Sequence, residues 1–417
     1  MNLKLSEKFL SLIDTLITND IKPVLVGGYL RDYYLKNLKS KDIDIELYNV
    51  SSIQDLISVL KPFGNVYEVG RSFGVLKMSY DGYEIDFSLP RTESKISKGH
   101  RGFEVKTYRD ISFKEASKRR DFTINSMGYD FKNELLLDPY CGLDDIKDKI
   151  LCCVDETTFV EDPLRLFRAV GFSGRFDFTC KQNLINLCQQ MYLNGSLESL
   201  AKERVFDEIK KLLLLSNRPS TGFKLLSQME ALRYFDKLYA LDKNSFSKTL
   251  DMLDTLAKRD IKDDKLKLKL MFCVLTLQMR RVEDVNNFVK SLTDEINLTK
   301  EILSLYQSYR DFLISTLTDF KIKTIALHVK IQELYILTAV TDDAKIRLKG
   351  KEFLSRAKAL HVSDRAPQAL LKGRHLIQMG LKPSKEFSQL LSKSFEAQLN
   401  GKFDNLTDAK IWLKSHL

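Results

Sequence analysis

Two aspartates stand two residues apart in a segment whose other residues favour a β-strand. Asp42 and Asp44 alternate with Ile43, Ile45 and Leu47 in the run Asp-Ile-Asp-Ile-Glu-Leu. Because residues i and i+2 of a strand point to the same face, we expect the two carboxylates to lie side by side. Adjacent carboxylates repel each other unless a cation binds, and Mg²⁺ prefers oxygen ligands. The pair therefore predicts a metal site at Asp42 and Asp44, with a solvated edge-strand face as the alternative.

A third acid is expected from a second strand-like run, Tyr-Glu-Ile-Asp-Phe-Ser-Leu. If that strand lies beside the first, Asp86 joins Asp42 and Asp44, and Glu84 on the same face is the competing choice. Carboxylates in this arrangement can hold two metal ions that clamp an in-line displacement at a phosphate. The pattern predicts phosphoryl or nucleotidyl transfer.

A glycine pair lies just before these acids, in Val-Leu-Val-Gly-Gly-Tyr-Leu-Arg. A buried strand that ends in Gly27 and Gly28 and leads directly into a helix lets backbone N–H groups approach a phosphate closely. Arg31 adds a guanidinium fork for phosphate oxygens. An ordinary strand-to-helix turn is the alternative, because a lone glycine pair is common.

The elements that must position these residues form an α/β unit at the front of the chain. Apolar runs bounded by Gly, Asp and Pro predict its strands, and helical periodicity predicts its helices. The expected strands are Pro23–Val26, Ile43–Leu47, Gly74–Ser79 and Tyr83–Leu89. The expected helices are Leu5–Ile17, Tyr29–Lys36 and Ser52–Leu60.

From about Asp162 onward, apolar residues recur at helical spacing and glycines become sparse. Helices are predicted over Lys202–Leu215, Lys265–Met279 and Ile302–Leu317. We therefore expect an α+β protein, in which a head with a mixed sheet and helices precedes an all-α neck, body and tail. The expected domains are 1–160, 161–230 and 231–417.

The composition fits a globular chain of 417 residues with a formal net charge of +10. A basic balance is compatible with a polyanionic partner but is weak evidence alone. The six cysteines show no CxxC spacing, which argues against a zinc site and favours free thiols in a reducing compartment. No apolar run is long enough to span a bilayer, and no signal-peptide pattern begins the chain, so we expect a cytoplasmic location without a membrane partner.

Five ordered motifs extend the pattern of glycines and acids. The segment Gly27–Asp32 together with Asp42–Asp44 resembles the signature of the class II CCA-adding enzymes and bacterial poly(A) polymerases. Three later segments strengthen the resemblance: Arg119-Arg-Asp-Phe-Thr-Ile-Asn125, Leu137-Asp-Pro-Tyr-Cys-Gly-Leu-Asp-Asp145 and Glu161-Asp-Pro-Leu-Arg-Leu-Phe-Arg-Ala169. The resemblance covers about residues 20–215 and is faint afterwards, apart from a stretch at 372–383.

The resemblance implies a role for each matching residue. Gly27, Gly28 and Arg31 would hold the triphosphate of an incoming nucleotide, and Asp42 and Asp44 would bind catalytic Mg²⁺. Arg120, Asp121 and Asn125 would hold the sugar and phosphates. The implied reaction is the template-independent addition of C and A, from CTP and ATP, to the 3′ end of tRNA, with release of pyrophosphate.

Base choice is assigned by the resemblance to Asp162 and Arg165, which lie one helical turn apart. Cytosine and adenine each present an amino donor beside a ring-nitrogen acceptor, which a carboxylate and a guanidinium complement. Uracil and guanine present the reverse order. An aspartate directly before Pro163 is also a common helix N-cap, so both roles stay open for Asp162. Arg168 either buttresses Asp162 or is a surface arginine.

The RNA substrate is less sharply indicated. Bacterial poly(A) polymerases carry a basic cluster of the type Arg-Arg-Phe-Arg, whereas this chain has Gly70-Arg-Ser-Phe-Gly74, which favours tRNA. A polar, glycine-containing loop expected over 90–103 argues against an enzyme restricted to C. An A-adding enzyme, a poly(A) polymerase and a non-catalytic RNA-binding protein remain the alternatives. The tail is expected to contact the acceptor and T arms of tRNA through basic clusters at Lys265–Lys269 and Lys345–Lys351, unless these are solvated helix faces.

Overall fold

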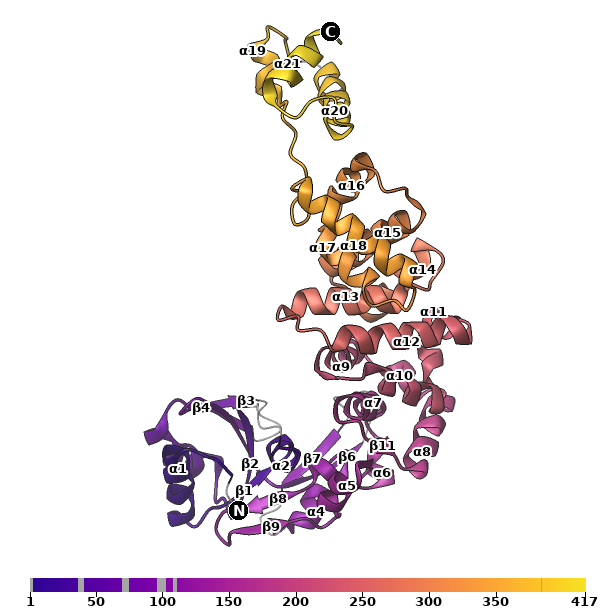
Figure 1. Ribbon diagram of the computed structural model, residues 1–417. Coiled ribbons are helices and arrows are strands. Elements are labelled where there is room, and N and C mark those ends of the chain that lie inside the picture. Colours follow the sequence, from indigo (N-terminus) through magenta and orange to yellow (C-terminus); the bar gives the residue numbers. More distant parts are fainter. Residues whose placement is uncertain (1–2, 37–40, 70–74, 96–102, 108–110, 384) are drawn as a thin grey trace. The chain divides into compact units, whose positions relative to one another are not determined.

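The computed structural model describes residues 3–36, 41–69, 75–95, 103–107, 111–383 and 385–417 (Figure 1). Its contacts divide the chain into two compact units, residues 1–232 and 233–417. The expected further boundary near residue 160 falls inside the first unit and stays a proposal. The Gly70–Gly74 stretch, on which the choice between tRNA and other RNA partly rests, lies outside the described residues.

A seven-stranded mixed sheet forms the head of the first unit, in the order β3-β4-β5-β2-β1-β8-β9. Its strands are β1 (Lys22–Val26), β2 (Asp42–Tyr48), β3 (Tyr67–Val69), β4 (Val75–Tyr80), β5 (Tyr83–Ser88), β8 (Gly128–Asp130) and β9 (Leu135–Leu137). Strand β2 lies at the centre, parallel to β5 and antiparallel to β1. The strand that bears the paired aspartates is therefore not at an edge, which excludes the edge-strand alternative.

Helices α1 (Glu7–Thr18), α2 (Gly28–Tyr34) and α3 (Ile53–Leu60) complete the head, as the apolar periodicity predicted (Figure 1). The serine caps Ser6 and Ser52 begin α1 and α3. Phe9 of α1 packs edge-on against Tyr83 of β5, with ring centroids 5.4 Å apart. The face of β2 that carries Ile43, Ile45 and Leu47 is fully buried, so its Asp42 and Asp44 face the other side.

One expectation for the head is partly wrong. A loop was expected over 90–103, but a two-stranded ribbon begins within this stretch. Its strand β6 (Arg91–Lys95) pairs antiparallel with β7 (Phe103–Thr107). The residues between these strands lie outside the described part. Backbone pairing between the two strands, which the polar sequence does not signal, accounts for the difference.

Helices dominate the rest of the first unit. They are α4 (Phe113–Ser117), α5 (Gly142–Asp148), α6 (Glu156–Phe159), α7 (Leu164–Phe176), α8 (Gln182–Leu193), α9 (Lys202–Leu215) and α10 (Pro219–Gln228). A short 3₁₀ turn, Thr123–Asn125, and a small parallel pair, β10 (Ile150–Leu151) with β11 (Thr179–Cys180), accompany them. Helix α7 packs tightly against α9 and α10. A Cβ on Gly174 of α7 would lie 2.4 Å from Leu212 of α9, and one on Gly222 of α10 would lie 2.9 Å from the Val170 carbonyl of α7.

The second unit is helical throughout the part that the structure describes, which confirms the expected all-α body. Its helices are α11 (Asp236–Tyr239), α12 (Lys243–Ala257), α13 (Asp264–Thr276), α14 (Val282–Leu292), α15 (Ile296–Ile314), α16 (Asp319–Ala326), α17 (Ile331–Thr338), α18 (Ala344–Ala359), α19 (Gly373–Gln378), α20 (Lys385–Leu399) and α21 (Leu406–Lys414). The last three share a small core of their own around Leu376, Phe403 and Leu413. Within the described residues, no helix is long and apolar enough to cross a membrane.

Candidate active site

A cavity of about 590 Å³ opens in the first unit, within the size range of small-molecule sites. Its walls come from the β1–α2 turn, β2, the 119–125 segment, α7 and α9. The lining residues are Gly27, Gly28, Arg31, Asp44, Arg120, Asp121, Asn125, Asp162, Leu164, Arg165, Arg168, Phe172, Arg175, Arg204, Glu208, Lys211 and Leu215. The lining thus includes every expected site residue except Asp42 and Asp86. Asp42 lies two residues before Asp44 on β2, and Asp86 lies opposite Asp44 on β5.

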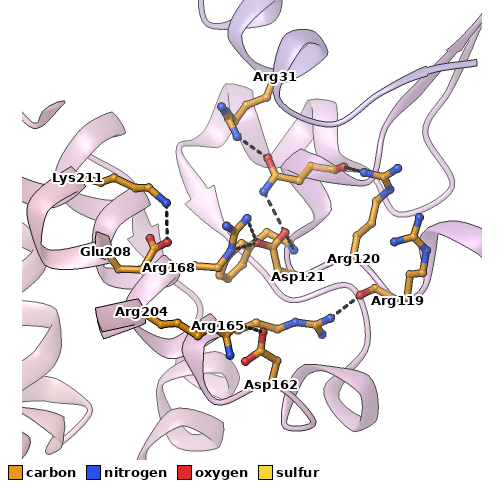
Figure 2. A network of polar contacts seen from close by, with 12 residues as sticks. Arg31, Arg119, Arg120, Asp121, Asp162, Arg165, Arg168, Arg204, Glu208 and Lys211 are labelled. Carbon is orange, nitrogen blue, oxygen red and sulfur yellow. Dashed lines mark hydrogen bonds and ion pairs between the residues drawn. The ribbon is translucent and has the colours of Figure 1, made fainter. Parts of the chain in front are cut away.

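The glycine pair closes the end of β1 with a conformation that requires glycine. Gly27 has φ +76°, and a Cβ there would lie 2.9 Å from a carboxylate oxygen of Asp44. The turn therefore presents bare backbone beside the acids. Arg31 in the first turns of α2 is buried, ion-paired with Asp32 at 2.8 Å, and donates a hydrogen bond to Asn125 Oδ1 at 2.6 Å (Figure 2).

The strand register explains how the acids meet. Asp44 of β2 lies opposite Asp86 of β5, and Asp42 lies opposite Glu84, so the two strands are neighbours as expected. Lys77 of β4 donates to Asp86 at 2.8 Å, whereas Glu84 accepts from the Ser79 hydroxyl at 2.7 Å. Asp86 is therefore the acid that shares its surroundings with Asp44, and Glu84 is engaged elsewhere.

The electrostatics of Asp44 favour a bound cation. Desolvation by the surrounding protein raises the pKa of Asp44, and Asp86 and Asp42 raise it further, against the lowering effect of Arg120. A divalent cation would relieve this repulsion, and the carboxylate oxygens of Asp42 and Asp44 are ligands that suit Mg²⁺. Among the described residues, no group of three or more His, Cys, Asp or Glu side chains is placed to hold a metal alone. The two acids fit a metal that is also held by nucleotide phosphates.

The 119–125 segment lies along the floor of the cavity, where its side chains join a network of hydrogen bonds (Figure 2). Asp121 is 7% exposed, accepts from the Asn125 amide at 3.0 Å and accepts from Arg168 Nε at 2.6 Å. Burial alone would raise the pKa of Asp121, but Arg168 and Asn125 outweigh it and hold the pKa below its ordinary value. Arg120 donates to the Asn125 carbonyl at 3.4 Å.

The ion pair of Arg168 was not among the contacts expected from the sequence. Arg168 pairs with Asp121, which lies 47 residues earlier in the chain. The cation beside Asp162 is instead Arg204 of α9, at 3.2 Å (Figure 2). In the sequence, Arg204 lies in a segment, 201–208, that resembles the next helical motif of the family, with an ordinary salt-bridged helix as the alternative.

This pairing yields a stability prediction. We expect Arg168→Ala to lower the free energy of unfolding by about 1–3 kcal/mol at neutral pH, because it leaves a buried carboxylate without its cation. Since the folded-state pKa of Asp121 is lowered from 3.8, the stabilisation is present above that value and is lost as the pH falls through the lowered pKa. Urea unfolding at neutral and acid pH measures both.

The matched control is Arg218→Ala, which breaks an exposed pair with Asp177 whose side chains are 53% and 55% accessible. We expect less than about 1 kcal/mol there. Equal losses in the two variants, or a loss for Arg168→Ala that does not shrink in acid, would contradict the assignment.

Asp162 and Arg165 line the cavity at the start of α7. One oxygen of Asp162 accepts from the Leu164 N–H at 3.1 Å, which is the helix-start contact expected from the sequence. The other accepts from Arg204. Arg165 donates to the Thr158 carbonyl at 2.7 Å and to the Arg119 carbonyl, which holds its guanidinium in place. Capping and base reading are thus compatible for Asp162.

Three further lining residues, Phe172, Arg175 and Lys211, were not expected. Arg175 continues the line of Arg165, Arg168 and Phe172 along one face of α7, at a spacing of three to four residues. The guanidinium of Arg31 lies 5.1 Å from the ring of Phe172 and 5.0 Å from that of Phe176. The helical spacing of these α7 residues was the signal available in the sequence. Such spacing does not distinguish a helix face that lines a cavity from one that packs against another helix.

Comparisons with known proteins agree with this geometry. Residues 24–152 match the family model of the poly A polymerase head domain, and residues 178–240 match a probable RNA and SrmB-binding site of polymerase A. A multifunctional CCA protein of Stenotrophomonas maltophilia is 36% identical over 215 residues, or 51% of this chain and 50% of that protein. A CCA-adding enzyme of Coxiella burnetii is 33% identical over 213 residues, or 51% and 54%. The chain spans about half the length of the curated relatives it matches.

Solved structures are similar over nearly the whole chain. A CCA-adding enzyme of Bacillus stearothermophilus in complex with CTP has a TM-score of 0.74 at 20% identity and covers 99% of this chain and 98% of its own. A CCA-adding enzyme of Thermotoga maritima in complex with tRNA has a TM-score of 0.71 at 20% identity, with 99% and 97% covered. At this identity the likeness shows the fold, which is the expected head followed by helices.

Proposed function

We propose that this chain, which matches the poly A polymerase head domain over residues 24–152 and a probable RNA-binding site of polymerase A over residues 178–240, adds nucleotides to the 3′ end of tRNA. It transfers C and A from CTP and ATP in the cytoplasm and releases pyrophosphate. One observation carries the proposal: a single cavity is lined by the glycine turn and Asp44 and also by Asp162 and Arg165.

The acid end of the cavity suits the transfer step. Asp42 and Asp44 would hold Mg²⁺, which would supply Lewis-acid stabilisation at the reacting phosphate, and Asp86 is the proposed third acid. Gly27, Gly28 and Arg31 receive the triphosphate through backbone N–H groups and a guanidinium. The RNA 3′-hydroxyl attacks the α-phosphorus of the nucleotide, and the bond to pyrophosphate breaks. The proton of the hydroxyl is released to water.

Recognition of the incoming nucleotide continues along the floor of the cavity. Arg120, Asp121 and Asn125 hold its sugar and phosphates, and Arg168 fixes Asp121 in the ionised form. At the far end, the Asp162 carboxylate accepts from the amino group of C or A, and Arg165 donates to the ring nitrogen. U and G present a carbonyl beside a ring N–H, so their hydrogen bonds to Asp162 and Arg165 cannot form. This mismatch is a strong basis for rejecting UTP and GTP.

The second unit carries the proposed contact with the acceptor and T arms, and two lysines of its basic clusters make contacts within the unit. Lys269 forms ion pairs with Glu333 at 2.8 Å and Glu301 at 3.4 Å. Lys349 donates to the carbonyls of Phe312, Leu313 and Ser315 at the end of α15. Both lysines therefore serve the internal structure of the unit, and the other basic side chains of the two clusters are the candidates for phosphate contact.

The proposal is tested with purified protein and a tRNA transcript that lacks its CCA end. Each of the four nucleoside triphosphates is supplied alone, with Mg²⁺ or with EDTA. Incorporation of C, and of A only after C, in Mg²⁺ supports the proposal. Binding of tRNA without any incorporation would make the protein a non-catalytic RNA-binding protein. Long A tails on unrelated RNA would make it a poly(A) polymerase.

Metal binding at the acids has a readout that does not depend on activity. We expect Mg²⁺ to raise the melting temperature of the wild type but not that of Asp44→Asn. In EDTA, the variant should melt at the same or a higher temperature than the wild type at neutral pH. Because the folded-state pKa of Asp44 is raised, its ionised form costs stability above that pKa, and this cost disappears as the pH falls through it.

Scanning fluorimetry over a Mg²⁺ titration measures both melting temperatures. The control is Glu84→Gln, which changes a neighbouring acid that is engaged with Ser79 and should respond to Mg²⁺ like the wild type. An equal Mg²⁺ response of Asp44→Asn and the wild type would place the metal elsewhere.

A further inference from the structure

A third acid on β2, Glu46, has no part in the nucleotide contacts described above. It lies on the same face of the strand as Asp42 and Asp44, but its side chain is completely buried. Its partner position on β1 is Val24, and the apolar cluster around it contains Val24, Val26 and Tyr48. A carboxylate in such surroundings is costly unless it is paired and hydrogen-bonded.

Two side chains satisfy Glu46. The Tyr48 hydroxyl donates to one carboxylate oxygen at 3.0 Å, and Arg119 Nη2 donates to the other at 3.0 Å. Arg119 lies 73 residues away in the chain and is only 17% accessible in its side chain. The charged, buried contact therefore ties the central strand of the sheet to the beginning of the 119–125 segment.

The same arginine touches the base-reading end of the cavity through its backbone. The carbonyl of Arg119 accepts a hydrogen bond from the guanidinium of Arg165 (Figure 2). The Arg119 side chain is held by Glu46. The Thr158 carbonyl also accepts a hydrogen bond from Arg165, at 2.7 Å. The position of the Arg165 guanidinium thus depends on where Arg119 sits.

We propose that Glu46 is a positioning residue for base selection, which acts through Arg119 to aim Arg165 at the Watson–Crick edge of the incoming nucleotide. This inference rests on the proposed function for its reaction and adds a residue that does not touch the substrate. It also links the strand that holds the catalytic acids to the pair that reads the base.

The test is Glu46→Gln, which keeps the size of the side chain but removes its charge and one of the two acceptor oxygens to which Tyr48 and Arg119 donate. We expect the preference for CTP over UTP to fall by about tenfold, within the loss that a small misplacement of a positioning group can cause. The preference is a ratio measured on one preparation, so a reduced folded fraction does not change it. In an Arg165→Ala background, Glu46→Gln should cause no further change in the ratio.

The matched control is Tyr48→Phe, which removes the hydrogen bond to the other oxygen of the same carboxylate and leaves Arg119 paired. Its preference for CTP over UTP should equal that of the wild type. If Glu46→Gln does not fold, Arg119→Lys disturbs the same bridge from its other end and should lower the ratio. The proposal would be overturned by an unchanged preference for CTP over UTP in whichever of Glu46→Gln and Arg119→Lys folds. An equal fall of this preference in Tyr48→Phe would also overturn it.

The ratio is also measured by calorimetric binding of CTP and UTP without RNA. This arm separates two failures. If the wild type incorporates nothing, the proposed function fails, while the binding ratio of Glu46→Gln still decides the role of Glu46. If the wild type adds C and A but Glu46→Gln keeps both the incorporation and the binding preferences, only the positioning role is lost.

Discussion

Replacement of Asp44 by alanine is expected to reduce nucleotide incorporation by about a thousandfold or more while the protein stays folded. Asp44 lines the cavity beside Gly27, and its carboxylate is surrounded by the charges of Asp42, Asp86 and Arg120. Loss of this ligand removes the site at which developing negative charge on the phosphate is offset. Asp42→Ala should have an effect of the same order, because both carboxylates share one strand face.

Single-turnover incorporation of C into a tRNA transcript measures the loss, with circular dichroism as the check on folding. Variants of the third acid extend the test: Asp86→Ala should reduce the rate strongly and Glu84→Ala only slightly, since Asp86 lies opposite Asp44 in the register. Near-normal rates for Asp44→Ala would contradict the assignment of the acids. A stronger effect of Glu84→Ala would exchange the two candidates for the third acid.

Base choice should relax when either member of the Asp162/Arg165 pair is changed. We expect Arg165→Ala and Asp162→Ala to reduce the preference for C and A over U and G by about a hundredfold, before transfer itself is abolished. Both side chains are held in place by the protein, Arg165 by two carbonyls and Asp162 by Arg204. A pre-positioned pair is what discrimination between donor and acceptor patterns requires.

Competition between CTP and UTP, and between ATP and GTP, measures this preference for each variant. Lys147→Ala is a suitable control, because it breaks an exposed pair with Asp144 outside the cavity lining. A uniform loss of rate for all four nucleotides, with unchanged preferences, would restrict Asp162 and Arg165 to a structural role at the start of α7.

Much of the site could be predicted from the sequence because its signals are local. The alternation of Asp42 and Asp44 with isoleucines marks both the strand and its polar face within a few residues. The limits predicted for helix α9, Lys202–Leu215, agree with the structure for the same reason, since apolar periodicity is a local property. The turn at Gly27 is likewise indicated by its glycine, which the positive φ requires.

The pairings between distant segments could not be predicted in this way. Arg168 meets Asp121, Arg204 meets Asp162 and Arg119 meets Glu46 only after the sheet and α7 have packed together. The parallel register that places Asp86 opposite Asp44 is equally non-local, because parallel strands need a long connection. Charged residues at regular helical spacing indicate a polar face but not its partner.

Completion of the CCA end of tRNA, the function proposed for this protein, is tested most directly by one measurement. A single transcript is prepared in three forms, which end before CCA, after C and after CC, and each is incubated with CTP and ATP, singly and together, in Mg²⁺. Products are resolved at single-nucleotide length. We expect all three forms to stop at CCA. Growth of only the CC form by one A would restrict the enzyme to A addition, and long A tails would contradict the claim.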